Sequence, residues 1–147
     1  MANQTTSDIV IDATPDKIMA IIADFKSYPS WATGVKGTEV VSEGVDGRAE
    51  EVRFVLDAPP IRDEYTLAYD WSGVSEVAWS LSERGKMLRA MDGAYVLDDL
   101  GDASTRVTYR LAVDVSIPLL GMLKRKAEKV IIDTALKGLK TRVEQGA

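Results

Sequence analysis

Alternation between apolar and polar residues predicts seven β-strands along the chain. In the first, over residues 5–12, Ile9 and Ile11 fall on one face. The other six lie within residues 35–115, where strands of roughly ten residues are separated by short turns. They are predicted over residues 36–42, 48–56, 62–71, 75–82, 86–97 and 105–115, with a loop at 98–104. Such spacing is typical of an antiparallel meander.

After the first strand the period changes to that of a helix. Thr14 is a good N-cap, Pro15 stands at the first helical position, and apolar residues then recur at helical spacing up to Phe25. Pro29 interrupts this pattern. We therefore predict a helical excursion over residues 15–33, with a short turn or second helix near its end.

A second helical segment closes the chain. Pro118 opens it, and the following apolar positions fall near one stripe: Leu120, Leu123, Ala127, Val130, Ile131, Thr134 and Leu139. No proline follows. We predict one helix over residues 118–143, about 40 Å long at a rise of about 1.5 Å per residue.

Together these elements predict a single domain over residues 1–147, of the α+β class. A twisted seven-stranded antiparallel sheet cannot lie flat, so it should curve and wrap around the long C-terminal helix. Side chains or a ligand must fill the space between the sheet and this helix. We expect a cavity on the order of a few hundred Å³ there.

The composition excludes several kinds of catalytic and metal-binding site. The 147 residues include no cysteine and no histidine, which excludes disulfides, thiol nucleophiles, Ser-His-Asp triads and metal sites built on those residues. Carboxylates alone would hold only a hard cation, and the acidic segment 98–104 lacks the spacing of a calcium loop. The glycines form neither a Walker motif nor a dinucleotide fingerprint. We predict no metal and no cofactor.

Charge is distributed unevenly. The chain carries a net charge of −5, yet residues 118–147 hold seven Lys or Arg and three Asp or Glu. The acidic body argues against nucleic-acid binding. No secretory signal and no membrane-spanning run is visible, so we expect a cytoplasmic protein. The basic stretch 123–129 suggests transient contact with a membrane surface; the alternative is a solvated helix face with pairs such as Lys124 and Glu128.

Aromatic residues are the main candidates for ligand binding. Amphipathic rings are favoured in small-molecule pockets because they combine apolar area with an OH or NH group. Strand alternation places most of them on apolar faces, where plain core packing is the alternative. The candidates are Trp31, Tyr65, Tyr69, Trp79, Tyr95 and Tyr109, together with Met122 in the apolar opening of the last helix.

Two arginines inside predicted strands are further candidates. At a cavity wall, the guanidinium of Arg53 or Arg89 would hold a carboxylate, a phosphate or an enolate oxygen. The alternative is that both face water on the outside of the sheet. Asp63 and Glu64 are adjacent, so they face opposite sides of a strand and form a poor carboxylate pair. No residue is identified as catalytic.

Several segments, taken in order, carry a family resemblance. They are IDATPDKIMAIIADFKSYPSW, DEYTLAYDW, WSL, MDGAYVL, TRVTYRLAV and IPLLGMLKRKAEKVIIDTALKGLKTRVE. Over residues 5–144 they resemble the START-like, or helix-grip, superfamily (SRPBCC), which includes polyketide cyclase/dehydrase-like and coenzyme Q-binding proteins. The resemblance implies a deep, mostly apolar cavity between the sheet and the last helix.

Three hypotheses for function follow. The favoured one is a binding protein that holds an apolar small molecule, such as a polyketide, a quinone or a lipid, in this cavity. The second is a polyketide cyclase/aromatase or dehydratase, in which Tyr, Asp or Glu would carry protons and Arg53 or Arg89 would stabilise an enolate. The third is a protein- or ribosome-interaction module. The oligomeric state is left open between a monomer and a homodimer.

Overall fold

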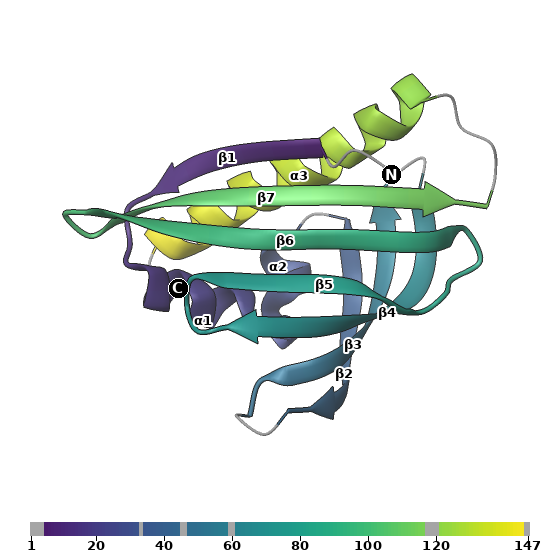
Figure 1. Ribbon diagram of the computed structural model, residues 1–147, viewed down its shortest axis with the longest axis horizontal. Coiled ribbons are helices and arrows are strands. Elements are labelled where there is room, and N and C mark those ends of the chain that lie inside the picture. The colour runs from purple at the N-terminus through teal and green to yellow at the C-terminus, as the bar shows by residue number, and fades with distance from the viewer. Residues whose placement is uncertain (1–4, 33, 45–46, 59–60, 117–120, 146–147) are drawn as a thin grey trace.

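The computed structural model describes residues 5–32, 34–44, 47–58, 61–116 and 121–145, and it confirms the predicted fold class (Figure 1). Seven strands form one antiparallel sheet in the order β1-β7-β6-β5-β4-β3-β2. The strands are β1 (Thr5–Ile11), β2 (Val35–Glu43), β3 (Ala49–Ala58), β4 (Ile61–Ser72), β5 (Glu76–Glu83), β6 (Leu88–Gly101) and β7 (Ser104–Val115). From β2 to β7, each strand pairs with the next along the chain, as a meander requires.

The helices occupy the two predicted positions. The first helix, α1 (Pro15–Ile22), follows β1, and the 3₁₀ turn η1 (Phe25–Ser27) leads into the single-turn helix α2 (Tyr28–Trp31). The long C-terminal helix is α3 (Gly121–Glu144); its predicted start at Pro118 lies outside the described residues. In the described parts of the chain, no helix is long and apolar enough to cross a membrane.

The sheet curves, and α3 covers its β1 end. In Figure 1, α3 runs behind β1 and β7, while β2, β3 and β4 turn away from the direction of β6 and β7. Strand alternation puts apolar side chains on the concave face; in β3 these are Val52, Phe54 and Leu56, all buried. Each Å² of apolar surface removed from water contributes about 25 cal/mol, so this face and the helices against it supply the core.

The buried stripe of α3 differs from the predicted one. Its buried apolar residues are Ala127, Ile132, Leu136, Leu139 and Val143. Val130 was placed in the stripe by its spacing, and this prediction is wrong because Val130 is 47% exposed. At 3.6 residues per turn, Val130 lies on nearly the opposite side of the helix from Ile132, Leu136, Leu139 and Val143.

Glu128 is buried rather than solvated, so the predicted surface pairing with Lys124 is wrong. Glu128 is 1% exposed, and its carboxylate accepts hydrogen bonds from the Thr5 hydroxyl at 2.6 Å and from the Val113 backbone N–H at 2.8 Å. In the β1–β7 register, Thr5 pairs with Leu111. The carboxylate therefore accepts a hydrogen bond from the Val113 N–H, two residues beyond this pair in β7. It links α3 to both strands.

The hairpin between β6 and β7 is longer than predicted. Residues 98–101 continue β6 instead of starting a loop. The turn itself consists of Asp102 and Ala103, both with φ of 55°, the conformation of a two-residue type I′ hairpin. The polar residues around this turn predicted a loop, but the backbone hydrogen bonding between β6 and β7 continues to Gly101, beyond the buried part of the sheet.

Candidate ligand-binding pocket

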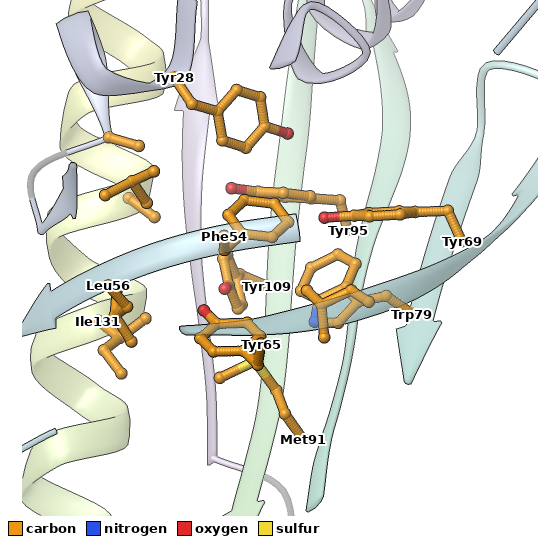
Figure 2. A pocket seen from close by; sticks show the side chains of 14 residues that line it. Tyr28, Phe54, Leu56, Tyr65, Tyr69, Trp79, Met91, Tyr95, Tyr109 and Ile131 are labelled. Carbon is orange, nitrogen blue, oxygen red and sulfur yellow. The ribbon is translucent and has the colours of Figure 1, made fainter. Parts of the chain in front are cut away.

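A pocket lies on the concave side of the sheet, where the sheet faces α2 and α3 (Figure 2). Its cavity has a volume of about 70 Å³, which is smaller than the few hundred Å³ expected from the sequence. All of its lining residues are uncharged: Tyr28, Ala32, Val35, Phe54, Leu56, Tyr65, Leu67, Tyr69, Trp79, Met91, Tyr95, Tyr109, Ile131 and Ala135. Aromatic side chains thus make up half of the residues around the cavity.

The alternation of side chains along each strand explains how the sheet builds this lining. Tyr65, Leu67 and Tyr69 are alternate residues of β4, so they share its concave face. In β6, Met91 and Tyr95 point the same way for the same reason. The helices close the other side through Tyr28 of α2, Ala32 directly after it, and residues along α3.

Cross-strand pairing packs the rings against one another. Tyr95 of β6 lies directly opposite Tyr109 of β7, and their ring centroids are 4.6 Å apart in an edge-to-face arrangement. The Trp79 ring lies 5.5 Å from each of them. Tyr69 is the cross-strand partner of Trp79, at 5.8 Å. Such pairs are each worth about 0.5–1.5 kcal/mol beyond the area that they bury.

Gly93 makes room for the Trp79 indole. The two residues are directly opposite in the β5–β6 register. A Cβ atom at position 93 would lie 2.6 Å from the indole ring, closer than such atoms approach. Only glycine at this position lets the ring lie against β6, where it contacts Tyr95 and Tyr109.

The polar groups of this lining are mostly unpaired. The Tyr28 hydroxyl donates to the Ile22 carbonyl oxygen. Among the described residues, no protein partner bonds the Trp79 Nε1–H or the hydroxyls of Tyr65, Tyr69, Tyr95 and Tyr109. Figure 2 shows the hydroxyls of Tyr69 and Tyr95 directed from the sheet toward the side where α3 lies.

Burial keeps the phenols neutral. Removal from water raises the pKa of every tyrosine in the pocket, because the charged phenolate loses its hydration; these are Tyr28, Tyr65, Tyr69, Tyr95 and Tyr109. Neighbouring phenols and carboxylates act in the same direction at several of these positions. At neutral pH each hydroxyl can therefore donate one hydrogen bond and accept others.

The structure brings five of the predicted site residues together in the pocket: Tyr65, Tyr69, Trp79, Tyr95 and Tyr109. Trp31 is buried outside this lining, with its ring 4.8 Å from that of Tyr28. Its carbonyl oxygen would lie 2.0 Å from a Cβ at Gly138, so this glycine lets α2 approach α3 closely. Met122 is in the first turn of α3, but its side chain lies outside what the structure describes.

Both candidate arginines lie on the convex face, away from the pocket. Arg53 forms an ion pair with Glu64 on the neighbouring strand, and Arg89 pairs with Asp114 at 3.1 Å. Their side chains are 42% and 53% exposed. This is the outward-facing alternative, so neither guanidinium reaches the cavity wall.

Asp63 organises a turn instead of facing solvent freely. Its carboxylate accepts hydrogen bonds of 2.8–2.9 Å from the backbone N–H groups of Glu64, Lys86, Met87 and Leu88. Burial acts to raise the pKa of Asp63, but these bonds outweigh it and hold the pKa below its usual value. The β5–β6 connection is thereby fixed at the end of the sheet near Met91.

Sequence reasoning missed several lining residues, notably Tyr28 and Met91. Tyr28 stands in the YPSW segment, where the interrupted helical pattern gave no direction for its side chain. Met91 carried a usable signal, because it alternates with Gly93 and Tyr95. Within the described residues, no three or more Asp or Glu side chains gather in a way that could hold a metal ion.

Comparison with known proteins places the chain in a family. Residues 3–144 match the family described as polyketide cyclase/dehydrase and lipid transport. None of the curated proteins matches the chain.

Solved structures share the fold. A START superfamily protein from Mycobacterium smegmatis superposes with a TM-score of 0.91 at 22% identity, covering 99% of this chain and 100% of that one. The Zhui aromatase/cyclase of a Streptomyces species gives a TM-score of 0.79 at 14% identity, covering 97% and 93%. A protein from Thermus thermophilus gives 0.79 at 21%, covering 98% and 99%. The START-like fold predicted from the sequence is confirmed.

Proposed function

The chain belongs to the polyketide cyclase/dehydrase and lipid transport family, and we propose that it binds an uncharged, mainly apolar small molecule in the aromatic pocket. One observation carries this proposal: all the residues that line the pocket are uncharged, and half of them are aromatic. Such a lining with a few polar groups is typical of small-molecule sites. Polyketides, quinones and lipids are the classes of ligand that we propose for this pocket.

The size of the cavity sets a condition on binding. A volume of about 70 Å³ has room for only a few water molecules. Ligand pockets commonly measure about 300–1,000 Å³. A ligand must therefore displace side chains as it enters. Met91 and Ile131 are suited to this movement, because a flexible thioether and an apolar helix contact leave no hydrogen bond to break.

Binding fits the pocket better than cyclase or dehydratase chemistry. The structural likeness to an aromatase/cyclase is at 14% identity and therefore concerns the fold. Cyclisation of a polyketone needs a base to remove a proton and a donor to stabilise the enolate. The buried tyrosines are neutral, which suits hydrogen-bond donation, whereas proton abstraction needs the phenolate.

The proposal is tested by titrating the protein with 1-aminoanthracene, an uncharged fluorescent ring compound. We expect saturable fluorescence enhancement. Ala135→Trp, which adds an indole to the pocket wall, should reduce it at least tenfold. Val130→Trp adds the same side chain to the exposed side of the same helix and should leave binding unchanged.

Two results would overturn the proposal: no saturable binding by the wild-type protein, or equal losses in both tryptophan variants. Ala135→Leu provides a milder filling of the same wall in case the larger side chain prevents folding. The melting temperature of each variant shows whether it is folded.

A further inference from the structure

The tyrosines are concentrated in one place. The sequence contains five, and all five line the pocket, contributed by α2, β4, β6 and β7. Phenylalanine would fill the same space with the same ring. The hydroxyl groups are therefore the feature that needs an explanation, since a hydroxyl that borders a cavity must be bonded by water or by a ligand, and one that loses water without gaining a partner destabilises the fold.

Tyr28 differs from the other four. Its hydroxyl is already bonded to the Ile22 carbonyl, and this bond joins α2 to the end of α1. The hydroxyls of Tyr65, Tyr69, Tyr95 and Tyr109, and the Trp79 Nε1–H, have no such bond within the described chain. Five polar groups from four strands thus border one small cavity whose surroundings are otherwise apolar.

We infer that these groups select the ligand: the pocket takes an uncharged, flat ring compound bearing several hydroxyl or carbonyl oxygens, in preference to a saturated acyl chain. The inference rests on the proposed function and narrows its ligand class. An acyl chain would bury the hydroxyls without partners, whereas ring oxygens would bond them. Sites that hydrogen-bond a ligand hydroxyl reject analogues that lack it far more strongly than apolar pockets discriminate by size.

The arrangement of the rings favours a flat ligand. Trp79, Tyr95 and Tyr109 lie within 5.5 Å of one another, with interplanar angles between 56° and 81°. A planar ligand entering such a tilted cluster meets ring faces and ring edges, the arrangements that aromatic pairs prefer. A flexible chain gains less from these contacts and loses more conformational freedom on binding.

The test is to compare three ring probes of increasing polarity, naphthalene, 2-naphthol and naphthalene-2,7-diol, with dodecanoate. In a purely apolar pocket, affinity follows hydrophobicity and naphthalene binds most tightly. We expect the opposite order, with the diol binding about tenfold or more tighter than naphthalene, because each satisfied hydrogen bond is worth about fivefold. Dodecanoate should bind most weakly.

Variants then assign the preference to particular hydroxyls. In the double variant Tyr95→Phe/Tyr109→Phe, the preference for the diol over naphthalene should fall about tenfold or more, while naphthalene binds as before or more tightly. Tyr28→Phe is the matched control, since it removes a hydroxyl of the same lining that is already bonded. It should lower stability and leave the preference unchanged.

The outcomes separate the two proposals. If none of the probes binds saturably, the proposed function fails. If the ring probes bind in order of hydrophobicity, or the double variant keeps the wild-type preference, only the inference about the hydroxyls fails. A preference for dodecanoate would likewise overturn the inference while leaving the binding function in place.

Discussion

The two faces of the sheet handle polar groups in opposite ways. On the convex face, charged residues pair with neighbours on adjacent strands, as Arg53 does with Glu64 and Arg89 with Asp114. On the concave face the lining is uncharged, and four tyrosine hydroxyls lack protein partners in the described chain. Water and neighbouring charges satisfy the first set, so it needs no ligand. The difference teaches that charged groups on the convex face are paired within the sheet, whereas the hydroxyls that border the pocket are left to bond a ligand.

The largest effect on stability is expected from ionising the tyrosines of the concave face at high pH. In the folded protein the pKa of each tyrosine is raised by burial, whereas in the unfolded chain it stays near 10. Above about pH 10 the unfolded chain loses these protons first, so the free energy of unfolding falls as pH rises. The slope is about 1.4 kcal/mol per pH unit for each tyrosine, and several titrate together.

Alkaline titration should therefore show tyrosinate absorbance and loss of secondary structure in one coincident transition. The urea-unfolded chain is the reference, because its tyrosines should titrate near their ordinary pKa. Tyrosines that ionise near pH 10 while the circular dichroism spectrum stays native would show that the fold does not raise the pKa of these phenols, contrary to the prediction.

The next largest effect on stability is expected from removing the Glu128 carboxylate, which lies on the side of α3 that faces the sheet. Glu128→Ala removes the acceptor of the Val113 N–H and the Thr5 hydroxyl, leaving both without this partner. We expect a loss of about 2–4 kcal/mol in urea unfolding. Asp133→Ala is the matched change on the outer side of the same helix, where the exposed Lys129–Asp133 pair should be worth under about 1 kcal/mol. Equal losses in the two variants would contradict the role given to Glu128.

A smaller effect is expected from a single methyl group. Gly93→Ala should displace the Trp79 ring and cost about 1–3 kcal/mol by overpacking, with a change in tryptophan fluorescence. Gly37→Ala, in edge strand β2, is the control because its Cβ would meet its nearest neighbour at 3.9 Å, an ordinary contact. If both variants melt at the wild-type temperature with unchanged fluorescence, the indole does not lie against β6 as described.

The sequence predicted what depends on local periodicity. Strand alternation puts Tyr65 and Tyr69 on one face of their strand and Tyr109 on the apolar face of its own, because alternation is a property of consecutive residues; which face lines the cavity is given by the structure. The direction of Arg89 could not be decided, and the structure shows why, since the β6–β7 register shifts between Leu88 and Ala90. One irregular residue is enough to change which face a strand side chain occupies.

Other features depend on packing that no local pattern contains. Glu128 lies among basic residues that suggest a solvated face, but its burial is decided by where α3 meets β1 and β7. The cavity volume depends on how far the aromatic rings fill the concave face, which composition alone does not give. The exposed residues Arg125 and Lys126 of α3 leave membrane contact as a prediction.

The smallest effect should come from the convex face itself. Arg53→Ala and Glu64→Ala each remove one partner of an ion pair whose side chains are 42% and 57% exposed. Solvent and salt screen such a pair, so each variant should lose no more than about 1 kcal/mol, and the coupling measured in a double-mutant cycle should shrink further at high salt. Binding of 1-aminoanthracene should be unchanged, because neither side chain borders the pocket. A tenfold loss of binding in Arg53→Ala would show that the convex face also contributes to ligand binding, contrary to the contrast drawn between the two faces. A large loss of stability without a loss of binding would instead show that the outer ion pair supports the curvature of the sheet.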